Sequence, residues 1–150
     1  MNAQSDSDRF QVNLPQGWED QTVYTFRGPE EGGIQHTLTL AVNRHLQHED
    51  IERFAKEQTE PITAGLQGVE VLKDEETTIE GGNPAYEFVY KWMPNEGQVI
   101  LNKRVFVIKD GMGFIFSSDF SKKTIKTVGA QLSEVIETLV PGTYEPLEEW

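Results

Sequence analysis

The chain has 150 residues, of which 37% are hydrophobic, a size and composition typical of one globular domain with its own core. It carries 25 acidic and 13 basic residues, a formal net charge of −12, so its surface should repel phosphate backbones and anionic lipids, and we expect no nucleic-acid partner. Because the sequence contains no cysteine, disulfides, thiolate catalysis and cysteine-based metal sites are excluded.

The N-terminal residues 1–8 are polar, and we expect a short disordered lead. They have neither the cationic start nor the apolar core of a secretory signal. No apolar run approaches the roughly 20 residues that a membrane span needs. These features predict a soluble, cytoplasmic protein that does not insert into membranes, with residues 1–150 forming a single domain.

The first elements are strands and turns. Residues 10–14 alternate between apolar and polar side chains and predict a first strand, which ends at the turn Pro15–Gly17. Trp18 follows this turn and is expected to cap the end of the core. A second strand is predicted over residues 22–26, ending where the loop RGPEEGG interrupts the β-branched and aromatic pattern.

A strand and then a helix are predicted next. In residues 36–42, Leu38, Leu40 and Val42 share one face and alternate with threonine and alanine, which is the period of a strand. After His48 the apolar pattern changes to helical spacing. Acidic residues occupy the first turn, and Pro61 and Gly65 mark the end. The positions on the helical stripe are Ile51, Phe54, Ala55, Gln58 and Ile62.

The C-terminal half predicts four further strands and a final helix. A strand over residues 69–79, interrupted by the charged DEE at 74–76, precedes the GGNP turn at 81–84. The strands 99–108 and 112–120 form a hairpin about the turn Lys109–Gly111. The strand that follows the GGNP turn, before residue 99, carries an aromatic stripe of Tyr86, Phe88, Tyr90 and Trp92. The helix begins at Ser121, ends at Pro141–Gly142 and is followed by an acidic tail at 141–150; its apolar positions are Ile125, Val128, Leu132, Val135, Ile136 and Leu139. The pattern predicts an α+β fold, an antiparallel sheet of about six or seven strands covered by two helices.

The sequence gives little support for catalysis. The histidines His36, His45 and His48 are interpreted as surface residues; the alternative is a metal site at His45-x-x-His48 with Glu49, a spacing that straddles a loop and a helix start. Nucleophile elbows, phosphate-binding loops and zinc-protease helices are absent from the sequence. We therefore expect a protein that is not an enzyme and has no cofactor or metal.

Binding is better supported, because several predicted strands have apolar or small residues on both faces. Part of the sheet is therefore available to a partner, unless dimerisation, long loops or the tail cover it. The aromatic stripe is interpreted as core, and the alternative is the wall of a small-ligand pocket.

The order of several segments resembles that of a known family. These segments are the run F-x-V-x-L-P-x-G-W-x-D-x-T at 10–22, Leu-x-Leu-x-Val at 38–42, EDIERFAKEQ at 49–58, PAYEFVY at 84–90 and RVFVI at 104–108. Together they are similar to the DcrB-like proteins, a group of unknown function with the Mog1/PsbP-like fold, an α/β/α sandwich. Members without a signal peptide resemble the Eag chaperones of type VI secretion, which hold the hydrophobic N-terminal transmembrane helices of effectors before export.

This resemblance implies a cytoplasmic, homodimeric chaperone with a concave, aliphatic sheet surface and glutamines that hydrogen-bond to the client. The positions of this sequence that match are Val23, Leu38, Leu40, Gln58 and Gln98. The pattern favours ordinary core for Leu38 and Leu40, because one strand face must pack beneath the helices, and Gln98 also fits a solvated turn. The alternative functions are a general Mog1/PsbP-like scaffold for a folded protein partner and a small-ligand binder.

Overall fold

A computed structural model describes residues 12–18, 22–44, 46–66, 68–79 and 81–141. Within these residues the chain forms six strands and two helices, and this confirms the predicted α+β class. The predicted lead at 1–8 lies outside the described residues, as does all of the predicted tail except Pro141. The elements are β1 (Val23–Glu31), β2 (Ile34–Asn43), α1 (Ile51–Gly65), β3 (Glu70–Ile79), β4 (Asn83–Asn95), β5 (Gln98–Lys109), β6 (Met112–Phe120) and α2 (Val128–Glu137).

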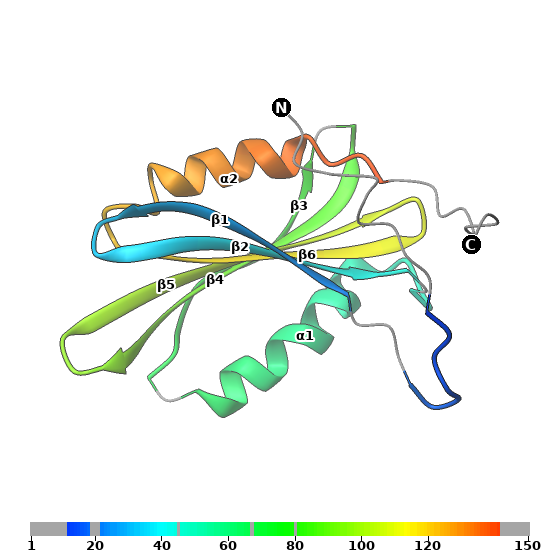
Figure 1. Ribbon diagram of the computed structural model, residues 1–150, viewed down its shortest axis with the longest axis horizontal. Helices are drawn as coiled ribbons and strands as arrows, with labels where there is room; N and C mark the ends of the chain where they lie inside the picture. The colour runs from blue at the N-terminus through cyan, green and yellow to red at the C-terminus, as the bar shows by residue number, and fades with distance from the viewer. Residues whose placement is uncertain (1–11, 19–21, 45, 67, 80, 142–150) are drawn as a thin grey trace.

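The strands form one antiparallel sheet in the order β1-β2-β6-β5-β4-β3, with β1 and β3 at its edges. The two helices lie on opposite faces of this sheet (Figure 1). The alternation along β5 shows this directly, because Val105 and Val107 pack in the cluster that contains Ile136 of α2, whereas Phe106 packs with Phe54 of α1. The architecture is therefore the α/β/α sandwich that the sequence resemblance implies.

The aromatic stripe of β4 forms the core beneath α1. Tyr86, Phe88 and Tyr90 are each no more than 4% exposed, and Phe54 meets Phe106 edge-to-face with 5.7 Å between ring centroids. The Tyr86 hydroxyl donates a hydrogen bond to Asp74, so its polar end is satisfied. The stripe is core, and the pocket-wall alternative is wrong.

Local sequence signals explain two of the element boundaries. Asp110 and Gly111 have φ angles of 53° and 74°, as a tight hairpin between β5 and β6 requires. At the start of α1, the Asp50 side chain accepts a hydrogen bond of 3.2 Å from the Arg53 backbone N–H, which makes Asp50 the N-cap.

The predicted first strand is wrong in its described part, because residues 12–15 belong to no strand, while residues 10–11 lie outside the described chain. The turn is present, since the Trp18 N–H donates to the Pro15 carbonyl at 3.2 Å. The Trp18 side chain, however, is 69% exposed and caps no core. The reason is that residues 12–18 run beyond the ends of the strands rather than across the sheet (Figure 1).

Two strands are more continuous than expected, and one helix is shorter. β1 runs through Pro29 to Glu31 with a register shift between Arg27 and Glu30, which an edge strand tolerates because its outer N–H groups need no partner. β3, the other edge, likewise continues through the acidic residues 74–76. The final helix begins at Val128 rather than Ser121, because the Ser121 and Thr124 hydroxyls hydrogen-bond to each other and to nearby backbone N–H groups.

Candidate functional site

A groove of about 510 Å³ lies between α2 and the β1–β2 side of the sheet. Its floor consists of Leu38, Leu40, Phe116 and Ser118. One wall is β1 from Phe26 to Pro29. The other wall is α2 with the two residues that follow it, through Val128, Gln131, Leu132, Val135, Thr138 and Leu139. His36 and Thr37 complete the lining. We call this feature the α2 groove.

The α2 groove exists because one helix is narrower than the sheet that it covers. Six strands spaced by about 4.8 Å are much wider than a helix of about 10 Å diameter. α2 packs over β5 and β6, where Ile136 is buried against Val105 and Phe114. On this face, β1 and β2 therefore remain beside the helix rather than beneath it.

Polar contacts from β5 hold α2 and the residues that follow it. Lys103 donates to the Ser133 hydroxyl at 3.2 Å, and Lys109 donates to the Leu139 carbonyl at 2.9 Å. Lys103 and Lys73 also form ion pairs with Glu87. Burial tends to raise the pKa of Glu87, but the hydrogen bond from Lys73 and the charge of Lys103 outweigh it and hold that pKa below its ordinary value.

The α2 groove leaves large apolar side chains in contact with water. Phe26 is 43% exposed and Val135 is 46% exposed, although Leu38 and Phe116 in the floor are buried. Leu40, Leu132 and Leu139 are half-buried. An open apolar surface of this kind is typical of a binding groove rather than of a finished core.

A buried histidine closes one end of the α2 groove. His36 is only 2% exposed, with Nδ1 2.8 Å from the Pro29 carbonyl and Nε2 2.9 Å from the Thr124 hydroxyl. Since a carbonyl can only accept, Nδ1 carries a proton and donates to Pro29, and Nε2 forms a hydrogen bond with the Thr124 hydroxyl. His36 thus joins β1, β2 and the segment that leads into α2, and the expectation that it lies on the surface is wrong.

The residues matched from the resemblance do not form one site. Leu38 and Leu40 lie in the floor of the α2 groove. Val23 pairs with Ala41 on the opposite face of the sheet and is 54% exposed. Gln58 is exposed on α1, because the neighbouring Thr59 takes the buried position of the stripe.

Gln98 is exposed at the start of β5, where its side-chain oxygen accepts from Asn95 at 3.1 Å.

The sequence reasoning missed Phe26, His36 and the α2 wall. A signal for that wall was present in the breadth of the helical stripe, which includes Ile136 toward the sheet and Val135 toward the groove. An apolar stripe that is wider than packing against the sheet requires indicates that the helix has a second apolar contact.

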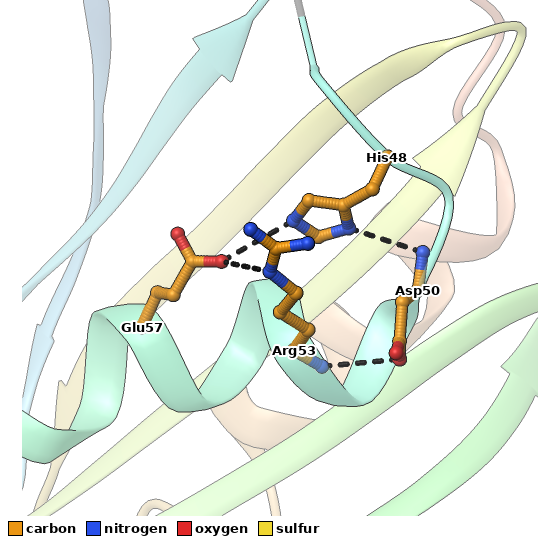
Figure 2. A network of polar contacts seen from close by, with 4 residues as sticks. All are labelled: His48, Asp50, Arg53 and Glu57. Atoms are coloured by element: carbon orange, nitrogen blue, oxygen red, sulfur yellow. Dashed lines mark hydrogen bonds and ion pairs between the residues drawn. The ribbon is translucent and has the colours of Figure 1, made fainter.

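The second described histidine is part of a helix cap. His48 Nδ1 accepts from the Asp50 backbone N–H at 3.1 Å, and Nε2 donates to Glu57, which also accepts from Arg53 at 3.1 Å (Figure 2). Both ring nitrogens are therefore engaged, while His45 lies outside the described residues. Among the residues that the structure describes, no group of three or more His, Cys, Asp or Glu is placed to hold a metal ion.

The sequence between residues 11 and 138 matches the DcrB family. The chain belongs to the DcrB family. This match covers both helices and all six strands, including every residue that lines the α2 groove except Leu139. The sequence matches no curated protein.

Three solved structures are similar to this DcrB-family chain to different degrees. PA94 of Pseudomonas aeruginosa, a protein of unknown function with a proposed regulatory role, has a TM-score of 0.69 at 19% identity, covering 89% of this chain and 92% of that one. The Ran-binding protein Mog1p of Saccharomyces cerevisiae has a TM-score of 0.41 at 11% identity, with coverage of 69% and 61%. PsbP of the cyanobacterium Synechocystis, CyanoP, has a TM-score of 0.47 at 12% identity, with coverage of 85% and 96%.

Neither helix in the described part of this DcrB-family chain is long and apolar enough to cross a bilayer.

Proposed function

We propose that this DcrB-family chain is a cytoplasmic adaptor, not an enzyme, that shelters a hydrophobic N-terminal helix of a type VI secretion effector until export. The observation that carries the proposal is the α2 groove, an open apolar channel with a helical wall on one side and a strand on the other. A helix intended for a membrane aggregates in water, so its carrier must offer an apolar surface in place of lipid. The Eag chaperones that the sequence resembles act in this way.

The exposed side chains of the α2 groove supply the affinity. Full burial of a Val, Leu or Phe side chain contributes about 1.5 to 3 kcal/mol relative to exposure. Phe26 and Val135 are a little under half exposed, and Leu40 and Leu132 retain part of their accessible surface. Together they can contribute several kcal/mol, to which the buried surface of the client adds a similar amount before the cost of association.

The length of the groove supports a homodimeric complex. The wall helix α2 has 10 residues, which corresponds to about 15 Å. A membrane-spanning helix has about 20 residues and a length of about 30 Å. One groove therefore covers about half of such a helix, and two copies of the chain would cover it completely.

The test is co-expression of the chain with an apolar N-terminal effector segment, followed by affinity purification of the complex. Wild-type protein should recover the segment in soluble form at two copies of the chain per segment. Val135→Glu and Leu40→Glu, which place a carboxylate in the groove, should abolish recovery while the circular dichroism spectrum stays native.

Val23→Glu is the matched control, because Val23 has similar exposure but lies on the opposite face of the sheet. It should recover the segment as well as wild type does. Loss of recovery with Val23→Glu alone would assign binding to the opposite face and favour a scaffold for a different partner. Equal recovery with all variants would remove the groove from the function.

A further inference from the structure

The two ends of the α2 groove can be told apart by the residues that close them. At one end His36 contacts Pro29 of β1 and Thr124, just before α2 begins; we call this the His36 end. At the other end the last turn of α2 leads to Leu139, whose carbonyl accepts from Lys109; we call this the Leu139 end. A rod-like client in the groove must run from one end to the other.

The His36 end has an excess of positive charge. Lys122, Lys123 and Lys126 are exposed on either side of Thr124. Glu30 and Glu31 are the carboxylates of the adjacent hairpin, so the balance is 3 − 2 = +1. Within the described part of the chain, none of the three lysines takes part in an ion pair.

The Leu139 end has the opposite character. Glu134 is exposed on α2, one residue before the lining residue Val135. Glu137 follows Ser133 by one helical turn, on the side of α2 that Lys103 contacts, and already has an interaction within the protein. α2 has no acidic residue in its first turn and no basic residue in its last turn. Its charges are thus arranged opposite to the pattern that stabilises a helix through its own dipole. Lys109 of β5 contacts the carbonyl of Leu139, two residues after the helix ends. The stability of α2 therefore does not account for this arrangement.

We propose that the α2 groove selects the direction of its client helix, which lies antiparallel to α2. The client's N-terminal flank carries lysine or arginine and meets Glu134, and its C-terminal flank is acidic and meets Lys122, Lys123 and Lys126. In this direction both the flanking charges and the two helix dipoles are complementary. The inference rests on the proposed function, because it needs a helix in the groove.

The size of the preference follows from the exposure of these charges. Exposed ion pairs are individually weak, so a few of them favour one direction by about threefold to tenfold at low ionic strength. Because the screening length shortens from about 10 Å at 0.1 M salt to about 3 Å at 1 M, the preference must decrease with salt while the apolar affinity persists.

The probes are two synthetic peptides with the same apolar helical core of Leu and Ala, about 12 residues long. One peptide carries Lys-Lys before the core and Glu-Glu after it, and the other carries the two pairs exchanged. Acetylated and amidated ends remove the terminal charges. Fluorescence anisotropy should show tighter binding of the first peptide, and Lys122→Glu with Lys123→Glu should cancel or invert the preference.

The matched control for this double variant is Arg53→Glu with Lys91→Glu. It changes the net charge equally, but Arg53 lies on α1 and Lys91 on β4, outside the groove lining. This control should keep the wild-type preference. Direction is read separately by disulfide cross-linking, which the absence of native cysteine makes specific. A peptide with an added N-terminal cysteine should cross-link faster to Thr138→Cys than to Lys123→Cys.

The outcomes separate the inference from the function on which it rests. Equal affinity of the two peptides, or faster cross-linking to Lys123→Cys, overturns the antiparallel direction and leaves the carrier function standing. Failure of both peptides to bind at any salt concentration overturns the proposed function itself, and the inference with it.

Discussion

Replacement of His36 by phenylalanine tests the polar junction that closes the α2 groove. His36→Phe keeps the ring and its contact with Phe120, at 5.7 Å between centroids, but removes the hydrogen bonds to Pro29 and Thr124. Each bond contributes about 0.5 to 1.5 kcal/mol, and a buried carbonyl left without a partner costs about 1 to 3 kcal/mol. Because Thr124 keeps its contacts with Ser121, we expect a loss of about 2 to 4 kcal/mol in the free energy of unfolding.

Urea unfolding followed by far-ultraviolet circular dichroism measures this loss. His48→Phe is the control, because the His48 side chain is 16% exposed and its Glu57 partner is 54% exposed, so water replaces part of what is lost. It should cost less than about 1 kcal/mol. A loss below about 0.5 kcal/mol for His36→Phe, or one no larger than that for His48→Phe, would refute the role assigned to this junction.

Three further changes test the fold around the site. Gly113→Ala should destabilise the protein by about 1 to 3 kcal/mol in urea, because the new Cβ would lie 2.7 Å from Phe54 Cζ; a neutral effect would mean that α1 shifts freely. Asp50→Ala should cost about 1 kcal/mol through loss of the α1 N-cap, whereas Asp50→Asn should cost little; equal losses would contradict the capping role. The pKa of Glu87 is lowered on folding, so its stabilisation is present above its ordinary pKa of 4.5 and is lost as pH falls through the folded value. The stability difference between wild type and Glu87→Gln should therefore shrink below pH 4.5, and a constant difference from pH 7 to pH 3 would exclude the ion pairs as its cause.

Elements set by local chemistry could be predicted from the sequence. The hairpin at Asp110–Gly111 follows from backbone angles that few residue pairs adopt, and α1 follows from a cap and a helical stripe. The sequence alone could not decide which residues of that stripe are buried in its second half. Gln58 and Thr59 lie three and four residues after Ala55, so both fit helical spacing, and packing decides that Thr59 is buried.

The α2 groove itself depends on tertiary placement that no local pattern encodes. Leu38 and Leu40 read as one strand face, but whether a helix covers them depends on where α2 crosses the sheet. Trp18 was misplaced for the same reason, since the segment before β1 leaves the sheet instead of packing on it. His36 looked like a surface residue because its partner Thr124 is 88 residues away in sequence.

The central claim is that an apolar helix occupies the α2 groove, and methyl chemical-shift mapping tests it most directly. Isotope-labelled protein is titrated with an uncharged apolar helical peptide. The account predicts shifts at Leu40, Leu132, Val135 and Leu139, with Val23 and the methyl groups beneath α1 unchanged. Shifts confined to the α1 side of the sheet, or none at saturating peptide, would contradict it.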